Sequence, residues 1–249
     1  MSAVVALILV GVAVFMLGRM SGAASSSSPS SPASAAAPAR VQSSTPQTSS
    51  RVINSHEYVD LGLSVLWATC NVGASSPGVT GNFYSWGETS PKGVYSHTNY
   101  SLGNAEQFYK YVPYNYPLYS MTYSPDGRLA LEYQDDAASS NWGSPWRTPT
   151  KAEFEELNTR CSHQWTSRDG QSGMLFIGPN GNSIFLPAGG WCDAQGLKDS
   201  GSKGFYWSKS LKVESPNCAY RLYFDYDKVG ASFWYGRFYG YMVRPVADR

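Results

Sequence analysis

Residues 173–187 read GMLFIGPNGNSIFLP, and this stretch decides the fold class of the chain. Two apolar runs flank the pair Asn180-Gly181, which readily adopts the positive φ angles of a tight turn. Apolar runs on either side of Asn-Gly are the strongest short-range signal for a β-hairpin. The stretch therefore predicts a pair of antiparallel strands.

Other short segments before and after the hairpin also have a strand-like composition. They are rich in β-branched and aromatic residues and are bounded by residues that favour turns. The expected strands are Glu57–Thr69, which reads as one or two strands, Asn82–Trp86, Gly204–Ser208, Ala219–Phe224 and Tyr241–Val246.

A helix is predicted shortly before the hairpin. Thr150 and Glu153 have the spacing of a capping box, in which each side chain accepts a hydrogen bond from the backbone of the other residue. Phe154 and Leu157 then fall on one helical face. These elements together predict an α+β domain with mixed, mostly antiparallel strands, one or two flanking helices and long loops. A second, weaker helix is expected near Ala105–Tyr109.

The first 52 residues differ from the rest in composition. Ser2–Gly18 is uncharged and would extend about 26 Å as a helix, against about 30 Å for a hydrocarbon core. A signal peptide normally has a basic segment before its apolar stretch, and here there is none, so the two alternatives stay open. Residues 1–20 are expected to be either a transmembrane anchor or a signal peptide. Residues 21–52 are rich in Ser, Ala and Pro and predict a disordered linker. The folded domain is expected at residues 53–249.

The charge pattern bears on the class of partner. The chain has a net charge of +1, and only 15% of its residues are charged. Residues 1–51 hold three arginines and no acidic residue, which leaves a net charge of −2 for the remainder. A nucleic-acid-binding face needs clustered Lys and Arg, so nucleic acid is not an expected partner.

The sequence also lacks the motifs of common catalytic and metal sites. Three scattered histidines have no zinc-site spacing, and there is no nucleophile elbow or phosphate-binding loop. No catalytic residue, metal or cofactor is therefore expected. The even number of cysteines permits two disulfides in three connectivities, or free thiols that pack as small apolar side chains. These cysteines are Cys70, Cys161, Cys192 and Cys218.

Several segments resemble a known bacterial family. They are Tyr58–Val65 (YVDLGLSV), Trp67–Ala74 (WATCNVGA), Tyr84–Thr89 (YSWGET), Trp146–Thr150 (WRTPT), Gly178–Gly181 with Ile184–Pro187, Tyr206–Ser208 and Val243–Val246. In this order they resemble the Fibrobacter succinogenes major paralogous domain. The resemblance implies a C-type-lectin-like fold, in which the N- and C-terminal strands pair and long loops carry the binding site.

The same fold class includes enzymes that generate formylglycine and proteins whose C-terminal region is rewritten at adenines by a retroelement. Between Ala219 and Tyr241 the sequence invites the second comparison. Most of its unusual residues, though not Trp234, belong to the set reachable from Asn codons by adenine changes, and binding loops favour a similar composition. The candidate ligand-binding residues are Tyr220, Arg221, Tyr223, Asp225, Tyr226, Asp227, Ser232, Phe233, Trp234, Tyr235, Phe238, Tyr239 and Tyr241.

Consecutive aromatic residues within this region argue for an exposed surface. Neighbouring residues of a strand point to opposite faces, so Phe233-Trp234-Tyr235 cannot all enter one core. Some of these rings should be exposed, unless long loops cover them. Exposed aromatic patches usually mark ligand or partner sites.

The sequence therefore predicts a membrane-tethered or secreted ligand-binding domain of the cell envelope, receptor-like or adhesin-like and facing outward. It would bind a protein or a carbohydrate through C-terminal, aromatic-rich, variable-type loops and contact the membrane through its N-terminal segment. It is not expected to be an enzyme. The alternatives are a structural surface or appendage subunit and, with less support, an oxidase related to the formylglycine-generating enzymes, which need two reactive cysteines close together.

Overall fold

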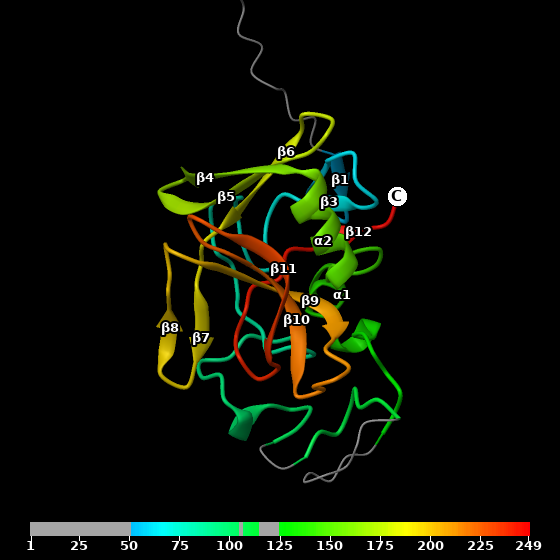
Figure 1. Ribbon diagram of the computed structural model, residues 1–249. Helices are drawn as coiled ribbons and strands as arrows, with labels where there is room; N and C mark the ends of the chain where they lie inside the picture. Colours follow the sequence, from blue (N-terminus) through cyan, green and yellow to red (C-terminus); the bar gives the residue numbers. More distant parts are fainter. Residues whose placement is uncertain (1–50, 105–106, 115–124) are drawn as a thin grey trace, which may run out of the picture. The chain divides into compact units, whose positions relative to one another are not determined.

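A computed structural model describes residues 51–104, 107–114 and 125–249 (Figure 1). The expected anchor or signal peptide at residues 1–20 lies outside the described residues, and so does the expected linker up to residue 50. Within the described ranges, no helix is both long enough and apolar enough to cross a membrane.

The described chain has an α+β fold in which antiparallel strands dominate. Strands β1 (Arg51–Ile53), β2 (His56–Asp60), β3 (Leu66–Ala68) and β12 (Val246–Ala247) form one sheet in that order, so the N- and C-terminal strands lie together. Strand β1 includes the last two residues of the expected linker, because all three of its residues pair with β2. The segment predicted as one or two strands forms two, β2 and β3.

The predicted hairpin is confirmed. Strands β5 (Gln171–Ile177) and β6 (Ser183–Pro187) pair antiparallel, and β4 (Ser162–Arg168) extends them to a three-stranded sheet. Gly181, in the connecting loop, has a φ of 83°, which is the left-handed conformation that the Asn-Gly signal implies.

A second three-stranded sheet lies in the C-terminal third of the chain. It contains β9 (Gly204–Leu211), β10 (Cys218–Phe224) and β11 (Val229–Gly236), with β10 in the middle. Two of the predicted strands, Gly204–Ser208 and Ala219–Phe224, are thereby confirmed. Beside this sheet stands a small hairpin of β7 (Trp191–Asp193) and β8 (Gly196–Lys198) (Figure 1).

The predicted helix is confirmed as α2 (Lys151–Arg160), which packs against β9, β10 and β11. Its capping box is present, because Thr150 Oγ1 accepts from the Glu153 N–H at 3.1 Å and the Glu153 carboxylate accepts from the Thr150 N–H at 2.7 Å. The second helix of the described residues is α1 (Ala137–Trp142), which was not predicted. Two short 3-10 turns, η1 and η2, span His97–Asn99 and Tyr133–Asp135.

Two predicted strands are wrong. Asn82–Trp86 and Tyr241–Val246 are loop segments that meet in a single bridge between Tyr84 and Tyr241, and only Val246 belongs to a strand. Gly81 and Gly87 turn the chain at positive φ on either side of the first segment, which keeps it from extending. Strands β4, β7, β8 and β11 were not predicted.

The weaker helix expected near Ala105–Tyr109 is not borne out where it can be followed. Ala105 and Glu106 lie outside the described residues, and Gln107–Tyr109 is not helical. Phe108 instead forms an isolated antiparallel bridge with Gly103. A five-residue helix has too few internal hydrogen bonds to persist without strong packing.

The β9–β10–β11 sheet separates two hydrophobic cores. The helix-side core lies between this sheet, α2 and the β4–β6 sheet, and includes Phe154, Met174 and Leu222. The loop-side core lies on the opposite face, under irregular segments, and includes Trp86, Trp207 and Tyr241. Tyr206 and Trp207 are neighbours on β9 but belong to different cores, as strand alternation requires.

Candidate functional site

The predicted ligand-binding residues do not form one surface. Arg221, Tyr223, Phe233 and Tyr235 lie on the loop-side face of the β9–β10–β11 sheet, where their side chains contact one another and Phe205. Tyr220, Ser232 and Trp234 lie on the opposite face, next to α2. Asp225, Tyr226 and Asp227 form the β10–β11 turn, and Phe238, Tyr239 and Tyr241 follow β11.

An arginine surrounded by rings is the central feature of the loop-side face. The guanidinium carbon of Arg221 lies 4.8 Å from the ring centroid of Phe205, 5.1 Å from those of Tyr235 and Tyr241, and 6.0 Å from that of Tyr223. These are cation–π distances. Three adjacent strands and the segment after β11 supply the rings. We call these five residues the Arg221 cluster.

Tyr241 supports Arg221 from inside the molecule. Its side chain is only 1% exposed, and its hydroxyl accepts a hydrogen bond from Arg221 Nη1 at 2.7 Å. Burial raises the pKa of Tyr241 far above its ordinary value, so the hydroxyl stays neutral. The backbone beside it is fixed to β9, because the Met242 N–H donates to the Phe205 carbonyl. Tyr241 was predicted as a ligand contact, but it presents no ring at the surface.

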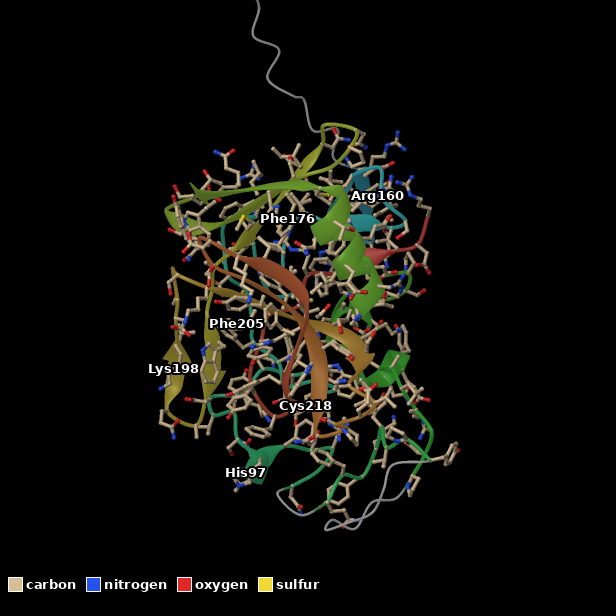
Figure 2. All side chains as sticks on the ribbon, viewed as in Figure 1. His97, Arg160, Phe176, Lys198, Phe205 and Cys218 are labelled. Carbon is tan, nitrogen blue, oxygen red and sulfur yellow. The ribbon has the colours of Figure 1, made fainter. Side chains whose placement is uncertain are left out.

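Two further rings, Trp191 and Tyr239, lie next to Tyr235 of the cluster, toward solvent. We call Trp191, Tyr235 and Tyr239 the outer rings. The Tyr235 and Tyr239 centroids are 4.8 Å apart, and Trp191 lies 5.3 Å from Tyr239 and 6.4 Å from Tyr235. Two hydrogen bonds of 2.9 Å between Cys192 and Gly240 hold the β7–β8 hairpin against this segment. Figure 2 shows Phe205 between the hairpin that carries Lys198 and the strand that carries Cys218.

The α2 face of the sheet has a different character. Tyr220 pairs across the strands with Trp234, and the ammonium groups of Lys151 and Lys212 lie 5.2 Å and 5.6 Å from the Tyr220 ring. Ser232 donates a hydrogen bond to Glu155 of α2 at 3.0 Å. A shallow groove of about 420 Å³ runs between α2 and β11, partly lined by Ser232 and Phe233. Trp234 is 47% exposed.

The β10–β11 turn holds itself in shape. The Asp225 carboxylate accepts from the backbone N–H groups of Asp227 and Lys228 and from the Tyr223 hydroxyl. Burial opposes ionisation of Asp225, but these donors outweigh it and keep the pKa of the carboxyl below its ordinary value. Burial, with the Asp225 carboxylate beside it, raises the pKa of Tyr223 to about 12. Tyr226, by contrast, is 73% exposed.

Sequence reasoning missed two residues of this site. Phe205 directly precedes Tyr206 and Trp207, which belong to a segment of the family resemblance. The face of the sheet on which Phe205 lies depends on how β9 is oriented. Trp191 lies on a short hairpin whose turn, Asp193–Gly196, contains the residue types that favour turns. That signal could have located the hairpin, although not its position beside Tyr239.

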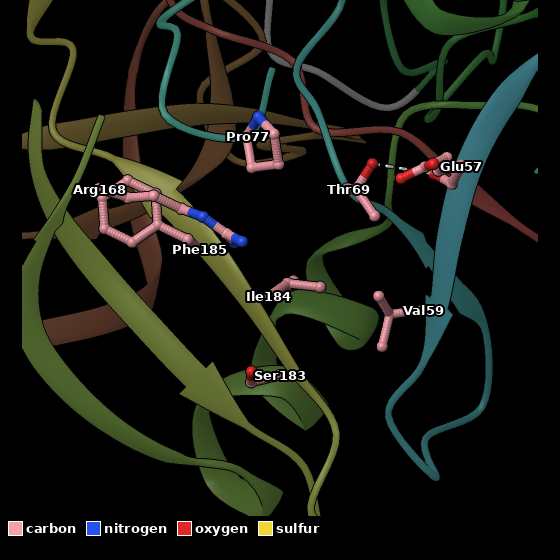
Figure 3. A pocket seen from close by; sticks show the side chains of 8 residues that line it. All are labelled: Glu57, Val59, Thr69, Pro77, Arg168, Ser183, Ile184 and Phe185. Carbon is pink, nitrogen blue, oxygen red and sulfur yellow. Dashed lines mark hydrogen bonds between the residues drawn. The ribbon is translucent and has the colours of Figure 1, made fainter. Parts of the chain in front are cut away.

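A polar cleft lies elsewhere, between β2 and the β4–β6 sheet. Its volume is about 260 Å³, and no predicted site residue lines it. Figure 3 shows Arg168 and Phe185 on one side of this cleft, with Glu57 and Thr69 on the other. The Thr69 hydroxyl donates to the Glu57 backbone carbonyl at 3.3 Å, which closes that wall.

All four cysteines are described, and none forms a disulfide. Cys161 and Cys218 are buried, and Cys70 and Cys192 are half-buried. Burial raises the pKa of Cys161 and of Cys192 to about 11 and also raises the pKa of Cys218. Since the thiolate is the nucleophile, these three thiols are poorly suited to covalent chemistry at neutral pH. Among the residues that the structure describes, no group of three or more His, Cys, Asp or Glu side chains could hold a metal ion.

No protein-family model matches the chain, and searches of curated proteins and of solved structures return no significant match.

Proposed function

We propose that residues 53–249 are a C-type-lectin-like ligand-binding domain, related to the Fibrobacter succinogenes major paralogous domain, that binds its ligand at the Arg221 cluster and the outer rings. The observation that carries the proposal is a half-buried arginine among rings that reach the surface, with Tyr235 41% exposed. Packed aromatic side chains at a surface give large contact area at low entropic cost.

The topology supports the proposed fold. Strands from both ends of the domain share the β1–β2–β3–β12 sheet, two helices flank the sheets, and the described residues between β3 and α1 are mostly irregular. Arg244 joins these parts, because its guanidinium donates to the Asn71 side chain and to the carbonyls of Ala68 and Phe185. The Val243–Val246 segment of the family resemblance thus has a structural role here.

The role we propose is binding at the bacterial cell envelope, with the domain tethered to or secreted from the membrane and facing outward. The raised pKa values of three thiols support a non-enzymatic role over that of a formylglycine-generating oxidase. A protein or carbohydrate ligand, without a cofactor, is consistent with an aromatic surface that surrounds an arginine.

We also propose that the C-terminal region is the target of a diversity-generating retroelement. Exposed residues of β11 and its preceding turn, such as Tyr226 and Tyr235, can change without disturbing either core. Inspection of the gene neighbourhood tests the idea: a near-copy of the 3′ end that differs at adenines, next to a reverse transcriptase, is expected. A neighbourhood without that template would refute the diversification.

Two adjacent residues allow a matched test of binding. Trp234 and Tyr235 are both exposed aromatics, but they point to opposite faces of the sheet. The full chain and its Trp234→Ala and Tyr235→Ala variants would be applied to arrays of surface glycans and surface proteins. We expect Tyr235→Ala to lose the array signal, with its thermal midpoint nearly unchanged, and Trp234→Ala to keep it.

The structural surface or appendage subunit makes the opposite prediction. If Tyr235 only packs, Tyr235→Ala lowers the thermal midpoint and the unmodified chain gives no array signal. That pair of results would overturn the binding function and favour the structural subunit.

A further inference from the structure

Arg221 differs from Arg128, Arg147, Arg244 and Arg249 in what its side chain contacts. Arg237 also lies among rings but is fully buried, whereas Arg221 is half-buried. Arg128, Arg147 and Arg249 each form an ion pair, and the buried Arg244 is surrounded by acceptors. Within the described residues, Arg221 pairs with no carboxylate and makes one side-chain hydrogen bond, to the Tyr241 hydroxyl. Its positive charge is therefore held among rings without a counter-ion.

The Nε atom of Arg221 makes this arrangement costly for the free protein. It is buried and has no hydrogen-bond acceptor among the described residues. A buried donor without an acceptor loses its hydration and gains nothing in return, and the loss is larger for a charged group. A ligand that brings an anionic acceptor would remove this cost.

We propose that Arg221 binds the carboxylate of an acidic sugar, a hexuronate unit of a surface polysaccharide, whose pyranose ring stacks on the outer rings. The inference rests on the proposed ligand-binding function and names the ligand class of the same site. The planar guanidinium fork matches a carboxylate through two parallel hydrogen bonds, and neither Nε nor Nη2 of Arg221 has an acceptor among the residues that the structure describes.

The outer rings favour a saccharide over an acidic peptide. Trp191 stands nearly edge-on to both Tyr235 and Tyr239, at interplanar angles of 73° and 75°, so its ring face and theirs point in different directions. Such a corner offers flat apolar faces next to the Arg221 guanidinium. An acidic peptide would be recognised better by several cations, whereas a uronate carries one carboxylate on a ring with an apolar face.

Tyr235 is the exposed ring beside Arg221. Of the four rings around Arg221 it is the one with the largest exposed fraction, and it lies at the end of the edge strand β11. Replacing Tyr235 with Ala removes one stacking face and leaves the Arg221 guanidinium in place, so the variant separates charge recognition from stacking.

The test uses titration calorimetry of the full chain with an oligosaccharide of glucuronic acid, and the matched glucose oligosaccharide as the neutral probe. We expect the uronate to bind and the glucose probe to bind about tenfold to a hundredfold more weakly. Arg221→Gln should remove that difference, and Arg221→Lys should weaken uronate binding because it keeps the charge but not the fork. Trp234→Ala, on the opposite face, should bind as the unmodified chain does.

Several results would overturn the proposal. Equal binding of both probes, insensitive to Arg221→Gln but lost in Tyr235→Ala, would refute acid recognition while the proposed binding function stands. Binding of hexaglutamate as tight as that of the uronate would refute the saccharide. If the full chain binds other ligands on the arrays but not the uronate, the inference is refuted and the proposed function stands. If it binds nothing on the arrays and nothing in calorimetry, the proposed function is refuted as well. If Arg221→Gln fails to fold, the Arg221→Lys and Tyr235→Ala titrations decide.

Discussion

The helix-side and loop-side cores share one sheet, yet they are built from different side chains. The helix-side core is mostly aliphatic, with residues such as Leu157, Ile184 and Leu222. The loop-side core is dominated by Trp, Tyr and Phe. The difference follows from what covers each face. A helix and paired strands satisfy their own backbone groups, whereas irregular segments leave carbonyls that need donors from elsewhere.

Tryptophan and tyrosine supply those donors from inside the core. Trp86 Nε1 donates to the Ser208 carbonyl and Trp207 Nε1 to the Tyr84 carbonyl, both at 2.8 Å. Nearby, the Tyr100 hydroxyl donates to the Trp86 carbonyl at 2.7 Å. Many of the aromatic residues of the chain are therefore needed because loops, and not regular elements, cover this core. At the edge of that core Tyr235 remains exposed.

The largest effect is expected on the helix side. Leu222→Ala should lower the free energy of unfolding by about 2–5 kcal/mol, because the side chain is fully buried and a cavity replaces it. Urea denaturation of the full chain measures the change. A loss below about 1 kcal/mol would mean that this face collapses around the gap and is less rigid than its packing indicates.

A smaller effect, of another physical origin, is expected on the loop side. Trp207→Phe keeps an aromatic ring but removes the indole N–H that donates to the Tyr84 carbonyl, which keeps the Tyr241 N–H as its other donor. Unfolding should become easier by about 1–2 kcal/mol, from the lost hydrogen bond and the volume that the smaller ring no longer fills. Trp234→Phe, which changes an exposed ring in the same way, should stay within about 0.5 kcal/mol of the unmodified chain. Equal losses in the two variants would contradict a hydrogen-bonding role for the buried indole.

Acid should weaken the attachment of α2. Burial alone would raise the pKa of Glu153, but the Arg147 guanidinium and the Thr150 N–H outweigh it and hold the pKa below the ordinary 4.5. A carboxyl whose pKa falls on folding stabilises the protein above its unfolded pKa, and this stability is lost as pH falls through the folded value. Thermal midpoints should therefore drop below about pH 4.5.

Two variants test the assignment of that acid effect. Glu153→Gln should flatten the drop, since it removes the titrating group. Glu155→Gln, which changes the more exposed pair with Lys151 and the hydrogen bond from Ser232, should keep most of it. An unchanged acid slope in Glu153→Gln would place the responsible group elsewhere.

The sequence correctly predicted those parts of the fold that depend on interactions between residues close together in the chain. The turn at Gly181 and the capping box of Thr150 and Glu153 depend on a few neighbouring residues, and both are present. The segments at Asn82–Trp86 and Tyr241–Val246 look like strands because aromatic residues favour sheets. In the structure these segments are irregular, and their side chains cover the loop-side core. That packing depends on contacts between residues more than 100 positions apart.

The site could be predicted in composition but not in geometry. Strand alternation correctly required Trp234 and Tyr235 to point in opposite directions, but it could not say which side the loops would cover. The place of Trp191 beside Tyr239 depends on the backbone pairing of Cys192 with Gly240. No motif in the sequence predicts that pairing. Arg221 was included for its residue type, whereas its lack of a counter-ion is visible only in three dimensions.

The smallest effect is expected in the β10–β11 turn, where neighbouring residues have contrasting roles. Tyr226 is 73% exposed, so Tyr226→Ser should change the free energy of unfolding by no more than about 0.5 kcal/mol. Asp225→Ser should cost about 1 kcal/mol, because its carboxylate accepts two backbone N–H groups and the Tyr223 hydroxyl. Urea denaturation of both variants measures the difference. If Tyr226→Ser were the costlier change, its edge contact with Trp165 would be structural, and the turn could not vary freely.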